Sequence, residues 1–87
     1  LYNHMMKTSD IINLLHNAIE AENMGKKISQ KKMAENCGIS MRTYQEWRLG
    51  SSAPMGIPVV FNMLGMLRDE DIVRLVRKIN DGQKGTV

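Results

Sequence analysis

Four side chains that could bind base pairs are grouped within residues 40–49. They are Met41, Arg42, Gln45 and Glu46. This spacing places them on one face of a helix. Arginine can donate two parallel hydrogen bonds to guanine, glutamine can bind adenine in the same way, and glutamate can accept from cytosine, while methionine can contact the thymine methyl group. A polar helix face can also be only solvated surface, so the residue types alone leave both interpretations open.

Positive charge is concentrated in the same part of the chain. Residues 26–48 hold six lysines and arginines against two glutamates, whereas the whole chain of 87 residues carries a net charge of only +3. Such a local excess is typical of proteins that bind a polyanion such as DNA, although a solvated helix face can carry it too. Hydrophobic residues at 43% and charged residues at 24% are ordinary for a folded domain and argue against a disordered chain.

Five helices are predicted to position these side chains, and no strand is predicted because alternating apolar residues are absent. The predicted helices cover residues 9–24, 29–37, 40–49, 58–67 and 69–79. Only Gly38, Ile39 and Ser40 separate the second helix from the body of the third. Two short helices joined by a glycine-containing turn are typical of the helix-turn-helix unit, whose second helix enters the major groove of DNA.

Serine and glycine residues mark the predicted ends of the first three helices. A serine side chain can accept a hydrogen bond from a backbone N–H in the first turn, and glycine readily adopts the left-handed conformation after the last turn. The expected caps are Ser9, Ser29 and Ser40, and the expected stops are Gly25, Gly38 and Gly50.

Apolar faces define the predicted core. The first helix is expected to bury the stripe Ile11, Leu14, Leu15, Ala18 and Ile19. The second is expected to turn Met33, Ala34 and Cys37 inward, with Cys37 as a small buried apolar residue. The fourth is apolar nearly all round, so it is predicted either to complete the monomer core or to form a subunit interface, and both interpretations stay open. The stripe of the fifth is Ile72, Leu75, Val76 and Ile79.

Residues 30–50, QKKMAENCGISMRTYQEWRLG, resemble the helix-turn-helix of the Cro and lambda-repressor-like (xenobiotic-response-element) regulators. The positions that match the family pattern are Gln30, Ala34, Gly38, Ile39, Ser40, Trp47 and Gly50. The resemblance implies an all-α fold, a compact five-helix DNA-binding domain whose second and third helices form the helix-turn-helix. Ala34 is expected to be small because the third helix crosses close to it. Ile39, Tyr44 and Trp47 are expected to be wedges between the helices and to make no DNA contact.

The resemblance also implies roles for the polar residues. The family's base-reading positions correspond to Met41, Arg42, Gln45 and Glu46, and its phosphate-binding position at the start of the second helix corresponds to Gln30. Further expected phosphate contacts are Lys31, Ser40, Thr43, Arg48 and Ser52. Arg48 departs from the pattern, since many members carry glutamate after the tryptophan. We expect no metal, no cofactor and no catalytic residue, because no paired carboxylate, nucleophile with a base, or metal-binding set occurs.

The organisation follows from length and composition. We expect residues 1–5 to derive from a cloning vector, residues 6–80 to form the DNA-binding domain, and residues 81–87 to be a flexible tail. No apolar run approaches the about 20 residues that span a bilayer, so we expect a cytoplasmic protein. The predicted function is that of a small homodimeric autorepressor of phage, plasmid or anti-CRISPR-associated type that binds a palindromic double-stranded operator. The alternative is an antitoxin or interaction module that holds a partner protein.

Overall fold

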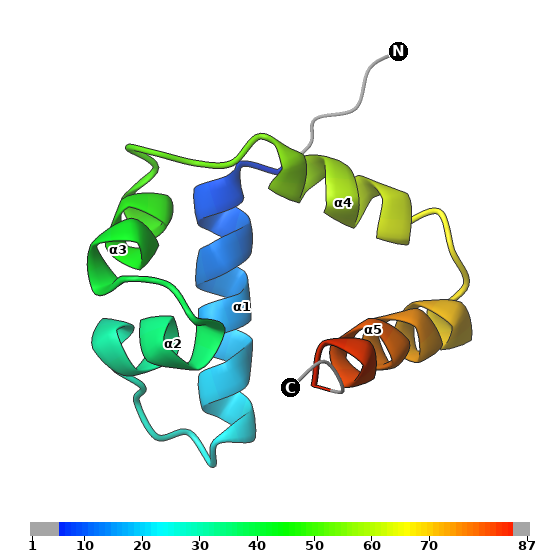
Figure 1. Cartoon of the computed structure of the whole chain (residues 1–87), viewed down its shortest axis with the longest axis horizontal. Helices are drawn as coiled ribbons and strands as arrows, with labels where there is room; N and C mark the ends of the chain where they lie inside the picture. Colours follow the sequence, from blue (N-terminus) through cyan, green and yellow to red (C-terminus); the bar gives the residue numbers. More distant parts are fainter. Residues whose placement is uncertain (1–5, 85–87) are drawn as a thin grey trace.

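The structure is a computed structural model that describes residues 6–84, and this part of the chain contains five helices and no strand. The helices are α1 (Thr8–Glu22), α2 (Gln30–Cys37), α3 (Met41–Leu49), α4 (Gly56–Leu64) and α5 (Asp69–Lys84). The all-α prediction is therefore confirmed. Figure 1 shows α2 and α3 on one side of α1, with α4 and α5 on the other. None of the described helices is long and apolar enough to cross a membrane.

The ends of α2 and α3 follow the local signals in the sequence. Ser29 Oγ accepts the N–H of Lys32 at 3.0 Å, and Ser40 Oγ accepts the N–H of Thr43 at 3.0 Å. Each serine thus satisfies one N–H that the first turn of its helix leaves without a partner. Gly38 ends α2 with a φ of 75°, a left-handed conformation that costs glycine little. The predicted caps and stops of these two helices are confirmed.

The core lies where α1, α2 and α3 meet. Its buried residues are Ile12, Met33, Ala34 and Tyr44, and the half-buried residues packed against them include Ile39 and Trp47. Ala34 is only 1% exposed, so a larger side chain at this position would push α2 and α3 apart. The expected positions of Ala34 and of the three wedge residues in the interior are confirmed.

Two predictions about α1 are wrong. The helix begins one residue earlier than Ser9, after Lys7, which makes no side-chain cap, and it ends at Glu22, before Gly25. Of the predicted apolar stripe, Ile11 is buried as expected, but the rest is exposed, with Leu14 at 56% and Ile19 at 44%. The buried side instead includes Ile12 and His16, because α2 and α3 pack across these residues.

Cys37 was expected to be buried, and this prediction is also wrong. Its side chain is exposed in the structure. Cys37 is the last residue of α2, where the chain turns away at Gly38, so α3 covers Met33 and Ala34 but not this end of the helix.

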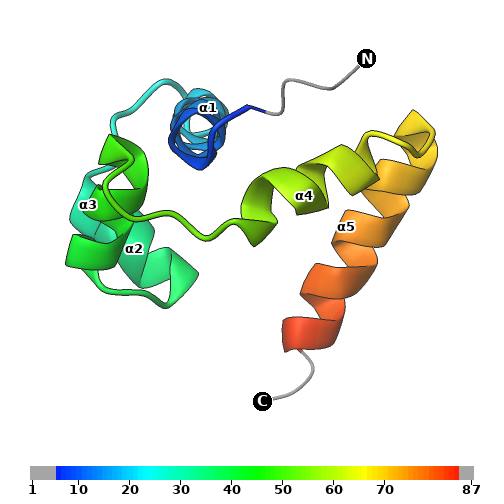
Figure 2. The same cartoon turned by 90° about the horizontal axis from the view of Figure 1, so that it is seen from above.

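The domain is less compact than expected. The radius of gyration is 14.1 Å, whereas a compact chain of this length has about 12 Å. No residue of α4 is buried, and α5 has no extensive contact with α1, α2 or α3. Figure 2 shows α4 leading away from the three-helix unit, with α5 at its far end. The predicted compact five-helix packing is corrected to a three-helix core with an extended two-helix arm.

The C-terminal boundary also differs from the prediction. Helix α5 continues to Lys84, beyond the predicted domain end at residue 80. The side chain of Asn80 donates to the carbonyl of Val76 at 2.9 Å, one turn earlier in the same helix. Residues 81–84 of the predicted tail are therefore helical, while the remaining predicted tail and the predicted vector-derived residues 1–5 lie outside the described residues.

Candidate nucleic-acid interface

The four predicted base-reading residues come together on the outer face of α3. Arg42 is 89% exposed, Met41 is 48% exposed, and Gln45 is also exposed. Glu46 is half-buried, with 38% of its side chain exposed. Tyr44, on the same helix, faces the core and is 4% exposed. The helix therefore separates a buried anchoring side from an outer side whose functional groups can reach a ligand.

Arg42 and Glu46 form an ion pair along this outer face. Arg42 Nε lies 3.4 Å from Glu46 Oε2, one turn apart on the helix. An exposed pair of this kind contributes little to stability, because water screens both charges. The Nε atom serves the pair, so the two terminal nitrogens of the guanidinium stay available for another acceptor. Arg42 and Glu46 are four residues apart, and this spacing on a helix could have predicted the ion pair from the sequence.

His16 connects α3 to the rest of the core through a buried hydrogen-bond network. Its ring is 3% exposed, with Nδ1 at 2.7 Å from the Tyr44 hydroxyl and Nε2 at 2.9 Å from the Ile28 carbonyl oxygen. A carbonyl only accepts, so Nε2 carries the hydrogen, and in this tautomer Nδ1 accepts from the Tyr44 hydroxyl. Burial raises the pKa of Tyr44, which keeps this donor protonated. The network joins α1, the loop after it and α3.

Sequence analysis gave His16 no structural role. His16 shares a helix face with Ile12, since residues four apart lie on the same side, but nothing local in the sequence shows that this face is the buried one. Within residues 6–84 the structure brings together no group of three or more His, Cys, Asp or Glu side chains that could hold a metal ion. His16 instead anchors Tyr44, which lies in the middle of α3.

Glu20 extends this network to the start of α2. Its Oε2 accepts the N–H of Ile28 at 2.7 Å and lies 3.3 Å from His16 Nε2. The hydrogen bond from Ile28 is the main reason that the pKa of Glu20 lies below its ordinary value, and nearby Lys27 acts in the same direction. The ionised carboxylate is thus the form that holds the loop between α1 and α2.

The lowered pKa of Glu20 predicts a pH-dependent contribution to stability. The unfolded chain takes up a proton at Glu20 before the folded chain does, so the contribution is fully present above the ordinary glutamate pKa and is lost as the pH falls through the lower folded value. We expect the difference in unfolding free energy between the wild type and Glu20→Gln to shrink between about pH 5 and pH 3. Urea unfolding measures it, with the exposed neighbour Glu22→Gln as control. A difference that stays constant with pH would contradict this role.

Arg48 binds α1 through Asn13. Its Nε donates to Asn13 Oδ1 at 2.7 Å, and Asn13 Nδ2 donates back to the Arg48 carbonyl at 3.3 Å. Its guanidinium also lies 6.0 Å from the centre of the Tyr44 ring. Asn13 thus provides a neutral partner for Arg48. The structure does not bring Arg48 together with the other predicted phosphate-contacting residues on α3.

The remaining predicted phosphate contacts occupy helix starts and one loop. Gln30 and Lys31 form the first turn of α2, and Lys31 is exposed. The Ser40 hydroxyl donates to Thr43 Oγ1 at 2.9 Å while it caps α3, so these two side chains are engaged with each other. Ser52 is exposed in the loop between α3 and α4.

Comparison with protein-family models, curated proteins and solved structures found no match to this chain. The functional inference below therefore depends on the geometry and the residue chemistry of the interface.

Proposed function

We propose that this chain is a sequence-specific regulator that binds double-stranded DNA in the manner of the Cro and lambda-repressor-like family, with α3 in the major groove. The observation that carries the proposal is the two-sided construction of α3. Its outer face exposes Met41, Arg42 and Gln45, while Tyr44 and Arg48 attach its inner face to α1. A helix held in this way presents its outer side chains to base edges in a constant orientation, as direct recognition requires.

The biological role that fits this proposal is a small homodimeric repressor of phage, plasmid or anti-CRISPR-associated type. A single short helix contacts few base pairs, so two copies on a palindromic operator supply the discrimination that one copy lacks. Such a protein acts by blocking RNA polymerase at a promoter, often its own, in the cytoplasm.

Selection of bound sites from random duplexes tests the proposal. We expect an enriched palindrome, and we expect binding to weaken steeply between about 50 mM and 200 mM salt, because phosphate contacts release counterions. Equal binding to every duplex, or no binding, would contradict the proposal.

Gln30→Ala is expected to lower affinity for all duplexes by a similar factor of about five, the effect of one lost hydrogen bond of about 1 kcal/mol. The reason is that a contact from the start of α2 to a phosphate positions the protein without distinguishing bases. Titration of matched and mismatched duplexes measures the effect. Gln45→Ala, on the outer face of α3, is the contrasting variant and should change the preferred base. A Gln30→Ala protein with altered base preference would overturn the assignment.

A second candidate function is an antitoxin or interaction module, and one observation favours it. Large apolar side chains on α4 are exposed, among them Val60 at 51% and Met63 at 61%, as is typical of a surface that binds another protein. The two candidates differ in their dependence on Arg42. In the interaction module, Arg42→Ala leaves partner binding unchanged, and the chain selects no DNA sequence.

A further inference from the structure

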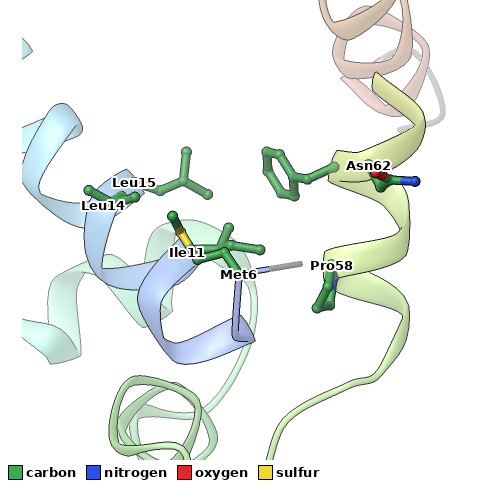
Figure 3. Close-up of a pocket in the computed structure, with 7 residues that line it drawn as sticks. Met6, Ile11, Leu14, Leu15, Pro58 and Asn62 are labelled. Atoms are coloured by element: carbon green, nitrogen blue, oxygen red, sulfur yellow. The ribbon is translucent and has the colours of Figure 1, made fainter. Parts of the chain in front are cut away.

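An open apolar groove of about 400 Å³ lies between α1 and α4. Figure 3 shows side chains of α1, among them Ile11 and Leu15, on one side of it and Pro58 of α4 on the other. The groove continues onto the exposed part of α1, where Leu14 is 56% exposed and Ile19 is 44% exposed. Water against so much apolar surface is unfavourable, so a partner that covers the groove gains the free energy of burying it.

Helix α5 carries an apolar face of matching spacing that is only partly covered, since Ile72 and Val76 are half-buried while Leu75 and Ile79 are exposed. Its apolar residues are Ile72, Leu75, Val76 and Ile79, and the face of α1 repeats the same intervals with Ile11, Leu14, Leu15 and Ala18. Leu75 is 38% exposed and Ile79 is 50% exposed, because α5 has no extensive contact with the three-helix core. The two faces are equally long and can pack side by side as neighbouring helices do.

The connection between α4 and α5 keeps α5 from the groove of its own chain. The N–H of Met66 donates to the carbonyl of Met63 at 3.1 Å, and the N–H of Leu67 donates to the carbonyl of Leu64 at 3.1 Å. This hydrogen-bonded turn sets the direction of α5 at the far end of α4 (Figure 2). To lie on α1 of the same chain, α5 would have to break the turn, whereas α5 of another chain can reach the groove with the turn intact.

We infer that a second copy of this chain covers the groove, and that α5 of each copy lies antiparallel to α1 in the groove of the other. This inference deepens the proposed function, because a homodimer is part of it. The reciprocal exchange has two-fold symmetry, so each contact between α5 and α1 occurs twice. The doubled contact increases the buried area toward that of a stable interface, which is about 1,200–2,000 Å².

Charge favours the antiparallel direction of α5. In this arrangement, with Leu75 over Leu15, Arg68 is level with Glu22, and Lys78 is level with Ile12 and so close to Asp10. In the parallel arrangement that matches the apolar residues, Lys78 is level with Asn17 and Arg68 with Lys7, so neither opposite-charge pair forms. Exposed pairs add little affinity, but they help to set the direction.

The inferred dimer is compatible with DNA binding. The groove lies on the side of α1 that faces away from α2 and α3 (Figure 1), so a copy seated there leaves Arg42 and its neighbours on α3 uncovered. The two-fold axis then relates two α3 helices, as a palindromic operator requires.

Cysteine cross-linking between different chains tests the inference. In a Cys37→Ser background, chains with Leu15→Cys and chains with Leu75→Cys are refolded together and oxidised without DNA. We expect a covalent dimer that contains one chain of each kind, identified by mass. Disulfides that link only Leu75→Cys chains to each other would overturn the exchange. A single chain that carries both substitutions and forms the disulfide within itself would also overturn it.

Sedimentation of the full chain without DNA is the second measurement. We expect a dimer that Leu15→Glu and Leu75→Glu each weaken about thirtyfold or more, the effect of losing a central interface residue. Val73→Glu is the matched control, because Val73 is 58% exposed and lies off the apolar face of α5, so the dimer should persist. A wild-type monomer, or assembly beyond a dimer, would overturn the inference.

These measurements separate the dimer from DNA binding. If the dimer fails, a monomer can still select a half-site through Arg42, and if DNA binding fails, the cross-linked dimer remains.

Discussion

His16→Ala is expected to lower the free energy of unfolding by about 3 kcal/mol, because it leaves the buried Tyr44 hydroxyl and the Ile28 carbonyl without their partner and opens a cavity. For a domain of this size each kcal/mol corresponds to about 4–8 °C in Tm. Urea and thermal unfolding measure the effect. Asn17→Ala, the exposed neighbour on α1, is the control and should change Tm little.

Tyr44→Phe isolates the hydroxyl of the same network. The ring remains in the core while Nδ1 of His16 loses its donor, so we expect a smaller loss of about 1–2 kcal/mol. The double variant should be less destabilised than the sum of the two single variants, because both remove one shared hydrogen bond. Strict additivity, or a His16→Ala protein as stable as Asn17→Ala, would show that this network does not hold α3 in place.

Arg42→Ala is expected to reduce discrimination at one base pair of the operator by about 1–3 kcal/mol, or about fivefold to 150-fold. The substitution removes a side chain that is 89% exposed and that forms an exposed ion pair with Glu46, so the fold should be unaffected. The measurement is titration of the selected duplex and its single-base variants, together with the Tm of the variant protein.

Two further variants sharpen the test of Arg42. Arg42→Lys keeps the charge but cannot make two parallel hydrogen bonds, so it should lose selectivity while it keeps most of its salt dependence. Arg77→Ala removes an exposed positive charge from α5, away from α3 and off the apolar face of α5, and should leave selectivity unchanged. If Arg42→Ala weakened binding to every duplex equally, Arg42 would contact phosphate rather than a base.

The sequence predicted the candidate site better than it predicted the packing of α1. The residues of the outer face of α3 lie within one helix, one or three to five positions apart. Helix geometry alone therefore predicts that they lie on the same side. Arg48 is the exception, because its bonds to Asn13 join positions 35 residues apart. A pattern of neighbouring residues cannot predict a hydrogen bond between positions so far apart. The family that residues 30–50 resemble often has glutamate at this position, so the resemblance did not indicate a partner for Arg48.

Local signals in the sequence were enough to predict the features whose physical causes act over three or four residues. Ser29 and Ser40 cap the helices that follow them, and Gly38 turns the chain between α2 and α3. These hydrogen bonds and backbone conformations require no distant partner. The buried side of α1 and the positions of α4 and α5 depend instead on contacts between helices that are distant in the sequence. Helix α1 has apolar residues on more than one side, and burial goes to the side against which α2 and α3 pack, where His16 joins Tyr44 across 28 positions.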